Sequence, residues 1–229
     1  MKKRKATTRS ICKRLLAVIL LIVLATAVLP AQKAEAAGST MGKSRITECK
    51  NMAYGIRLKW TAAANADGYR VLRRAMSESK YVCIKTTKSL EFRDRNTEAG
   101  QFYYYKIRPY KIIDGTKVLG TRSAEQVVFR LVQAEITSAG AGKTGIKLEW
   151  KAHDRGSYQA NIYYKVRRKE SGESSFRTIA SKLKKPAYTD ETVKAGKEYT
   201  YQVRAYAPVI TVSYSSWSEP ITIGSETAG

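Results

Sequence analysis

The sequence is poor in the residues on which catalytic and metal sites most often depend. Its 229 residues include one histidine, His153, which stands in a predicted loop where we expect it to be solvated. A serine or thiol nucleophile needs a positioned base beside it, and a transition-metal site needs several imidazole or thiolate ligands. We therefore expect a protein that is not an enzyme and that holds no cofactor or metal.

Cysteine is also scarce, with only Cys12, Cys49 and Cys83. Cys12 precedes the apolar run of the N-terminus, so it is not the lipid-bearing cysteine of an exported lipoprotein, which follows that run. Cys49 and Cys83 fall on different predicted strands. We expect two buried, unpaired thiols; a disulfide is the alternative, and it would need Cα atoms within about 7 Å of each other.

Residues 1–36 are predicted to be a secretory signal peptide. Lys and Arg crowd the first 14 residues, residues 15–29 are apolar apart from Thr26, and Ala34-Glu35-Ala36 offers a small-residue cleavage site. The apolar run is shorter than the roughly 20 residues of a membrane-spanning helix. An uncleaved N-terminal membrane anchor is the alternative. Both readings place the rest of the chain outside the cytoplasm, secreted or at the cell surface, and the lysine-rich signal looks bacterial.

The excess of positive charge does not reside in that segment alone. Removing residues 1–36 takes away eight of the 42 Lys and Arg and one of the 19 Asp and Glu, which leaves a net charge of +16. Such a protein attracts anionic partners, and for an exported chain we expect a cell-wall polymer or acidic polysaccharide. We expect no specific nucleic-acid binding, and a membrane only if the N-terminal segment is retained. General solubility is the alternative meaning of the charge.

One pattern occurs twice along the chain. IRLKW at 56–60 recurs as IKLEW at 146–150, and AGQFYYYKIRPY at 99–110 recurs as AGKEYTYQVRAY at 195–206. Apolar and charged residues alternate in these segments, which is typical of strands with one buried face. A repeat of this length predicts two copies of one domain, at 43–131 and 132–224. No Pro-, Gly- or Ser-rich linker separates them, so we expect the copies to abut.

Short strands broken by Gly and polar residues, with almost no helical pattern, predict β-sandwiches. Both copies have a Trp ending the second strand and the pattern Ala-Gly-x-x-Tyr-x-Tyr-x-(Ile/Val)-Arg-x-Tyr. In order and spacing they resemble the fibronectin type III family. The resemblance implies two tandem immunoglobulin-like sandwiches with Trp60 and Trp150 in their cores. It also implies tyrosine corners at Tyr103 and Tyr199.

Two smaller features belong to the same comparison. Residues 214–218, Tyr-Ser-Ser-Trp-Ser, are similar to the Trp-Ser-x-Trp-Ser box of cytokine-receptor members of this fold. That likeness implies rings interleaved with cations such as Arg204; an ordinary edge strand is the alternative. Asp94 and Asp190 stand at equivalent places in the two copies, where we expect them to bond nearby turn backbone.

Alternation also predicts a binding face. If Tyr103, Tyr105 and Ile107 face the core, their neighbours face outward beside the third strand. The candidate ligand-binding residues are Arg70, Arg74, Tyr104, Lys106, Arg108 and Tyr110 in the first copy, and Lys165, Arg167, Arg204 and Tyr206 in the second. Rings stack on sugars, and cations attract phosphate or carboxylate. A solvated strand face with no ligand is the alternative, because strands prefer such residues anyway.

These observations favour a non-catalytic, exported binding or adhesion module that engages an anionic wall polymer or polysaccharide through the basic and aromatic face. The alternative is an accessory spacer or protein-interaction subunit of another secreted or surface protein. It would use end loops such as residues 208–212, Pro-Val-Ile-Thr-Val.

Overall fold

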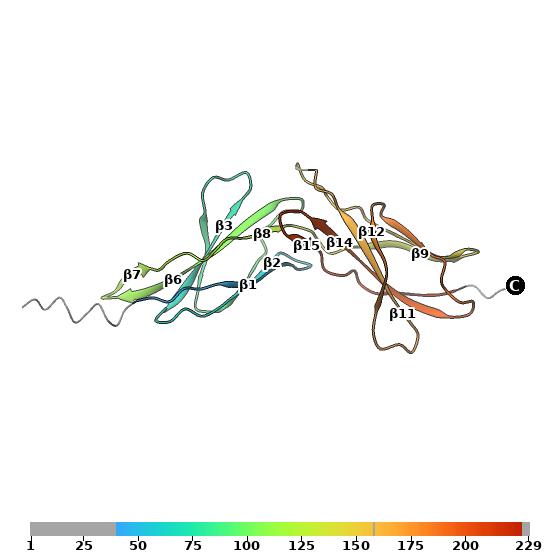
Figure 1. Ribbon diagram of the computed structural model, residues 1–229, viewed down its shortest axis with the longest axis horizontal. Coiled ribbons are helices and arrows are strands. Elements are labelled where there is room, and N and C mark those ends of the chain that lie inside the picture. Colours follow the sequence, from blue (N-terminus) through green and yellow to red (C-terminus); the bar gives the residue numbers. More distant parts are fainter. Residues whose placement is uncertain (1–39, 158, 226–229) are drawn as a thin grey trace, which may run out of the picture. The chain divides into compact units, whose positions relative to one another are not determined.

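The computed structural model describes residues 40–157 and 159–225, and their regular structure consists of β-strands (Figure 1). The segment 1–36, where the signal peptide is predicted, lies outside the described residues. Every strand given below lies in one compact unit, Met41–Gly229. Within the described part, no helix has the length and apolar character that crossing a membrane requires.

The first copy folds into two antiparallel sheets, which together form the first sandwich. The smaller sheet has the order β1(Ile46–Asn51), β2(Ile56–Trp60), β5(Glu91–Asp94). The larger has the order β4(Val82–Thr87), β3(Gly68–Ala75), β6(Phe102–Ile113), β7(Thr116–Leu119), and β8(Gln126–Phe129) also pairs with β6. One apolar cluster takes its members from both sheets, so the sheets face each other across it.

The second copy repeats this arrangement as the second sandwich. Its smaller sheet has the order β13(Ala187–Asp190), β10(Gly145–Trp150), β9(Ile136–Gly142). Its larger sheet has the order β12(Arg177–Leu183), β11(Tyr163–Glu170), β14(Glu198–Pro208), β15(Val212–Tyr214), and β16(Ile221–Gly224) also pairs with β14. The predicted fold class, all-β with two tandem immunoglobulin-like sandwiches, is confirmed. Strands β7 and β15, which pair with the ends of the long strands β6 and β14, were not predicted.

The alternating residues lie where period two places them. Ile56, Leu58 and Trp60 are buried on β2, while Arg57 and Lys59 between them are half-exposed. The second sandwich repeats this with Ile146, Leu148 and Trp150. Each Trp ring meets a Tyr ring edge-on, at 5.9 Å between the centroids of Trp60 and Tyr69 and 5.3 Å between those of Trp150 and Tyr164.

A tyrosine bonds backbone upstream of the long central strand in both sandwiches. The main-chain N–H of Glu98 donates to the Tyr103 hydroxyl at 2.9 Å, and that of Lys194 donates to the Tyr199 hydroxyl at 3.0 Å. Both rings are buried. This is the geometry that the fibronectin type III resemblance implies at these two positions.

Asp94 bonds turn backbone as expected, but it also forms a buried polar cluster that the sequence did not reveal. Its carboxylate accepts the main-chain N–H of Asn96 at 3.1 Å. It also accepts Arg73 Nη1 at 2.9 Å and the Tyr105 hydroxyl at 2.8 Å. Arg73 and Tyr105 come from the larger sheet and Asp94 from the smaller, so the cluster joins the two sheets.

The second sandwich has the same cluster around Asp190, which is fully buried. Its carboxylate accepts Arg168 Nη1 at 2.5 Å, the Tyr201 hydroxyl at 2.9 Å and the main-chain N–H of Thr192 at 3.0 Å. Because Arg168 is itself buried, this ion pair is shielded from water on both sides. A buried carboxylate is tolerable only when its charge and lone pairs are satisfied in this way.

The expectation of a solvated His153 is wrong. The side chain is 8% exposed, and its Nε2 lies 3.0 Å from the carbonyl oxygen of Val132. Its main-chain N–H donates to the Tyr164 hydroxyl at 3.0 Å. The loop folds back onto the segment that enters the second sandwich, and burial lowers the pKa of the imidazole. His153 is therefore a packing residue of the second sandwich.

Cys49 and Cys83 are unpaired, and they lie on β1 and β4 in opposite sheets of the first sandwich. Burial raises the pKa of the Cys49 thiol to about 12, so that thiol is inert. Cys83 is exposed, which corrects the expectation that both thiols are buried. Cys83 lies on β4, the edge strand of its sheet, where the other sheet does not cover every inward-pointing side chain.

Hydrogen bonds join the two sandwiches directly. Asn51 Nδ2 of the first sandwich donates to the carbonyl oxygen of Tyr214 in the second at 3.1 Å, and it also donates to the Phe129 carbonyl oxygen within the first at 2.9 Å. The main-chain N–H of Phe129 donates to Ser213 Oγ at 3.0 Å, and Thr211 Oγ1 donates to the Val127 carbonyl oxygen at 3.1 Å. The loop at 208–212, which we considered as a free binding loop, is thus already engaged by the first sandwich.

Arg130 closes the passage from β8 into the second sandwich. It is 3% exposed, and its Nη1 donates to the carbonyl oxygens of Met52 at 3.0 Å and Leu131 at 2.6 Å. Its Nη2 donates to the Ala53 carbonyl oxygen at 3.2 Å. Main-chain oxygens thus accept hydrogen bonds from both terminal nitrogens of this buried guanidinium, which holds the exit from the first sandwich in place.

Replacing Asp190 by asparagine should leave the Arg168 guanidinium buried without a carboxylate. Breaking a buried pair from one side costs about 3–5 kcal/mol. We expect D190N to lower the free energy of unfolding by about that amount, measured by urea denaturation followed through tryptophan fluorescence. D114N removes an exposed carboxylate at the β6–β7 turn and should change that free energy by less than about 0.5 kcal/mol.

D190N should also change how the free energy of unfolding depends on pH in the acid range. Burial alone would raise the pKa of Asp190, but hydrogen bonds from Thr192, Tyr201 and Arg168 outweigh it and hold the pKa below the ordinary carboxyl value. The folded pKa is thus lower than the unfolded one. The carboxylate therefore contributes stability above about pH 4, and this is lost as the pH falls through the folded pKa. Equal pH profiles for D190N and the wild type would contradict this.

Candidate functional site

The candidate residues lie on the outward side of the two larger sheets, which we call the outer faces. On the first outer face Arg70 is directly opposite Arg108, and Arg74 is opposite Tyr104. On the second, Lys165 is opposite Arg204. The structure thus brings the candidates of each copy together on one face, with the register that alternation requires.

Two of the predicted aromatic residues are not available to a ligand. Tyr104 and Tyr110 lie outside the core cluster of the first sandwich, yet each is only 8% exposed, and Tyr104 belongs to the other apolar cluster together with Phe129. The Arg74 guanidinium lies over the Tyr104 ring at 3.8 Å from its centroid, and Lys117 Nζ lies over the Tyr110 ring at 4.4 Å. Long cationic side chains cover flat rings in this way because the stem packs and the charge interacts with the ring.

Cations and rings interleave across the second outer face. The guanidinium carbon of Arg167 lies 4.5 Å from the Phe176 ring centre and 4.1 Å from that of Trp217. The guanidinium carbon of Arg204 lies 4.4 Å from the Trp217 ring centre and 4.2 Å from that of Tyr214. We call this series, Phe176–Arg167–Trp217–Arg204–Tyr214, the ring ladder. It is the interleaving that the box at 214–218 implies.

The ring ladder occupies the candidate residues of the second copy. Burial lowers the pKa of Arg204 and of Arg167, so both guanidinium groups are partly withdrawn from water. Lys165 Nζ lies 5.4 Å from the ring centres of both Tyr206 and Tyr214. The cations on this face therefore have ring partners in the chain, which favours a structural role for the face.

The first outer face differs from the second at one decisive position. The main-chain N–H of Ser123 donates to the Ile107 carbonyl oxygen at 2.7 Å, as that of Ser218 does to Val203 at 2.7 Å. The residue before Ser218 is Trp217, and the residue before Ser123 is Arg122. The first copy thus has a cation where the second has the central ring of its ladder. Aligning the two Ser residues in the sequence would have revealed Arg122, which the alternation argument missed.

Arg70 and Arg108 consequently face each other without rings between them. Arg70 Nε donates to Cys83 Sγ at 3.2 Å, and Arg108 Nε donates to the Gly120 carbonyl oxygen at 2.8 Å. Within residues 40–157 and 159–225, neither guanidinium forms an ion pair with a carboxylate. Like charges directly opposite on neighbouring strands are unfavourable. An anion between them would remove that cost.

Two further cations of the first outer face, Arg74 and Lys106, lie beside a carboxylate. Arg74 Nη2 lies 3.7 Å and Lys106 Nζ 3.9 Å from Glu125 Oε2, and the Tyr81 hydroxyl donates to the same oxygen. We call Tyr81, Arg74, Lys106 and Glu125 the Glu125 cluster. Burial and the neighbouring carboxylate raise the pKa of Tyr81, which keeps its hydroxyl proton. Sequence reasoning missed Tyr81 and Glu125, because neither belongs to the two strands used for the alternation argument.

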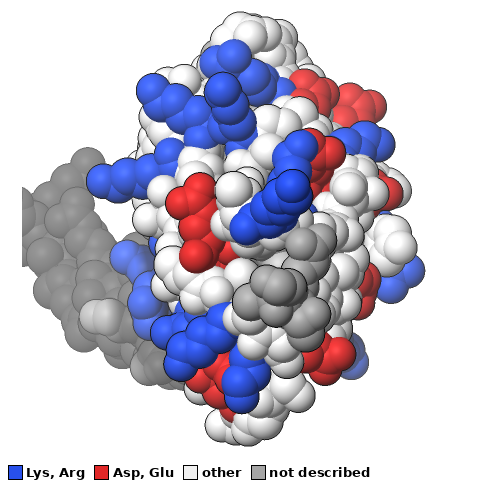
Figure 2. Space-filling model, turned by 90° about the vertical axis from the view of Figure 1, so that its right-hand side faces the viewer, with Lys and Arg blue, Asp and Glu red and all other residues white. Residues whose placement is uncertain are grey.

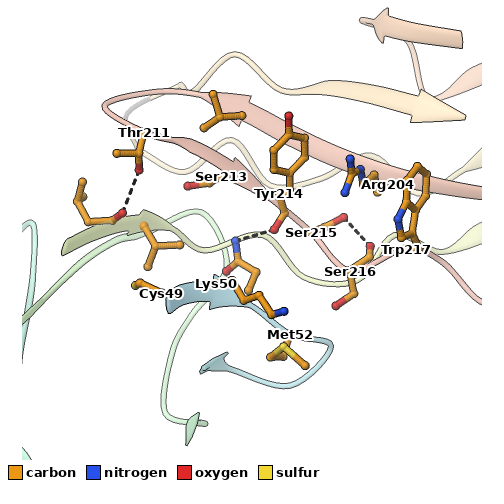
Figure 3. A pocket seen from close by; sticks show the side chains of 14 residues that line it. Cys49, Lys50, Met52, Arg204, Thr211, Ser213, Tyr214, Ser215, Ser216 and Trp217 are labelled. Atoms are coloured by element: carbon orange, nitrogen blue, oxygen red, sulfur yellow. Dashed lines mark hydrogen bonds between the residues drawn. The ribbon is translucent and has the colours of Figure 1, made fainter. Parts of the chain in front are cut away.

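A groove of about 440 Å³ lies where β1 and β8 meet the segment 211–217 (Figure 3). Lys50 and Met52 line one side of it, and Tyr214, Arg204 and Trp217 line the other. Its aromatic residues belong to the ring ladder, and its backbone takes part in the bonds that join the sandwiches. The groove is therefore part of the contact between the two sandwiches.

Net charge by itself does not locate a site. On the face shown in Figure 2, Lys and Arg are interspersed with Asp and Glu and do not form one continuous patch. Among the residues that the structure describes, no group of three or more His, Cys, Asp and Glu side chains could hold a metal ion. The local arrangement of Arg70 and Arg108 is therefore more informative than the overall charge.

Comparison with known proteins finds similarity to solved structures alone. No family model matches the sequence, and no curated protein matches it. The crystal structure of the FN1–FN3 domains of chicken CNTN1 is similar, with 18% sequence identity and a TM-score of 0.36. The match covers 82% of this chain and 66% of that chain, so this chain spans less than two thirds of its length. The fold assignment rests on the sheets and cores described above.

Replacing Trp217 by alanine should destabilise the second sandwich, because it removes the ring between Arg167 and Arg204. Lost ring packing and two lost cation–π contacts should cost about 2 kcal/mol or more, measured by urea denaturation. W217F keeps an aromatic ring and should recover a large part of the loss. Equal stability of W217A and the wild type would show that the ring ladder does not support the fold.

Proposed function

We propose that this protein is a non-catalytic, exported binding module of the fibronectin type III kind. In this proposal the outer face of the first sandwich engages an anionic polymer, such as a cell-wall polymer or an acidic polysaccharide. The observation that carries the proposal is the cross-strand pair Arg70 and Arg108, which has no carboxylate partner in the described chain. Export is inferred from the signal-like sequence at 1–36.

The chemistry of arginine supports an oxyanion ligand. A guanidinium offers a planar fork of donors that matches phosphate and carboxylate oxygens. The Nε atoms of Arg70 and Arg108 are engaged by Cys83 and Gly120, which restrains both side chains before a ligand arrives. A sheet face is open along its length, so it suits a polymer with repeated charges better than it suits a small molecule.

A second candidate is a spacer or protein-interaction subunit. The β6–β7 hairpin favours it, because Ile112, Ile113 and Val118 on that hairpin are 44%, 38% and 41% exposed. Exposed apolar side chains gathered on one hairpin mark a contact for another protein. The equivalent loop of the second sandwich, 208–212, already contacts the first. Apolar contact should persist at high salt, whereas polyanion binding should weaken steeply.

The double variant R70Q/R108Q tests the proposed function. Labelled polygalacturonate supplies repeated carboxylates and linear polyphosphate supplies repeated phosphates, so the two probes distinguish the source of the oxyanion. We expect the wild type to bind at least one of them at low salt. The affinity of the variant for that polymer should be lower by a factor of about ten or more, because two charge-assisted contacts are lost. Fluorescence anisotropy measures the affinity.

The matched control is K143Q/K147Q, which removes the same amount of charge far from the proposed site. Lys147 lies on β10, in the smaller sheet of the second sandwich, and Lys143 lies in the turn before it. Both lysines are exposed. If R70Q/R108Q and K143Q/K147Q weaken binding equally, the effect is one of net charge and the proposed site is wrong. If the wild type binds neither probe, the proposed function is wrong.

A further inference from the structure

The Glu125 cluster shows how the first outer face holds an oxyanion. Its carboxylate is supplied by the chain itself and is held by a guanidinium, an ammonium and a hydroxyl, from Arg74, Lys106 and Tyr81. These three groups come from β3, β6 and the segment just before β4, so the sheet itself positions them. The same donors would serve an external phosphate or carboxylate equally well.

This cluster lies next to the open arginine pair along the strands. Lys106 and Arg108 are two positions apart on β6, which puts their Cα atoms about 7 Å apart on the same face. Arg70 and Arg74 are four positions apart on β3, or about 13 Å. The cations therefore form two neighbouring groups along the strands, which we call levels: Arg70 with Arg108, which has no carboxylate partner among the described residues, and Arg74 with Lys106, which holds Glu125.

The second sandwich lacks this pair of levels. Phe176, which has no hydroxyl, replaces Tyr81, and Gln202 replaces Lys106. Gln202 accepts Arg167 Nε at 3.0 Å and donates to the Ser218 carbonyl oxygen at 2.7 Å. Donors arranged for a carboxylate thus belong to the first sandwich, where the open arginine pair also lies.

The two ion pairs of Glu125 are long and exposed, and a ligand that displaced Glu125 would also have to replace it as the acceptor of the Tyr81 hydroxyl. The Glu125 side chain is 37% exposed, and the two cations stand 3.7 and 3.9 Å away. Exposed pairs at such distances contribute little, because water and salt screen them. A polyanion already bound at Arg70 and Arg108 would present its next charge at high effective concentration.

We propose that Arg74, Lys106 and Tyr81 form a second anion subsite, which Glu125 occupies until a linear polyanion displaces it. This inference rests on the proposed function and adds a requirement to it: the ligand carries at least two anionic groups about 7–13 Å apart along the strands. A single anion fills the open pair and leaves Glu125 in place. Glu125 therefore sets the preference for polymers over isolated anions.

The variant E125Q tests the second subsite, with linear polyphosphate, polygalacturonate and inorganic phosphate as probes. Glutamine keeps an oxygen for the Tyr81 hydroxyl but removes the competing charge. We expect the affinity for the bound polymer to rise about threefold or more, and the affinity for inorganic phosphate to change by less than about 1.5-fold. Isothermal titration calorimetry measures both affinities, and a melting curve confirms that the variant folds.

The matched control is E91Q, since Glu91 pairs with Lys59 at 3.7 Å in the opposite sheet of the same sandwich. It makes the same change in net charge and should alter polymer affinity by less than about 1.5-fold. An equal rise for E91Q and E125Q would overturn the second subsite. If R70Q/R108Q still weakens polymer binding in that case, the proposed function stands and only the proposed role of Glu125 is wrong. If the wild type binds neither polymer, both fall.

Discussion

Each sandwich depends on one buried carboxylate that belongs to one sheet and is bound by the other. Asp94 and Asp190 end the last strands of the smaller sheets, and each holds an arginine and a tyrosine from the larger sheet. Apolar packing alone lets two sheets slide, since it has no direction. A buried ion pair with a hydroxyl has one geometry, so it sets which residues of the two sheets face each other.

The two sandwiches share the same buried carboxylate cluster, but their outer faces differ. The second covers its outer face with the ring ladder, in which every cation of the ladder lies between aromatic rings. The first has Arg122 at the place of Trp217 and divides its remaining cations into an open pair and a filled cluster. The cations of the ladder have ring partners and the arginine pair of the first face has none among the described residues, although the backbone of the two faces follows the same register.

Period-two alternation predicted most of the strands and which of their residues face inward, and the fibronectin type III resemblance added the roles of the buried Trp and Tyr residues. Alternation could not predict whether an outward side chain is exposed, because Tyr104 and Tyr110 are covered by cations from neighbouring strands. Nor could it find Glu125 or Tyr81, which reach the face from segments without a pattern. The burial of His153 and the engagement of loop 208–212 depend on contacts between distant segments, which local sequence does not encode.

The way in which Arg130 is bound bears on how this protein can evolve. Its two terminal nitrogens donate to the carbonyl oxygens of Met52, Ala53 and Leu131, and every amino acid has such an oxygen. Substitutions at those three positions leave the acceptors in place, whereas a change of Arg130 itself removes all the donors at once. The exit from the first sandwich is thus fixed by one side chain and by main-chain oxygens, whereas the bonds between the sandwiches depend on the side chains of Asn51, Ser213 and Thr211.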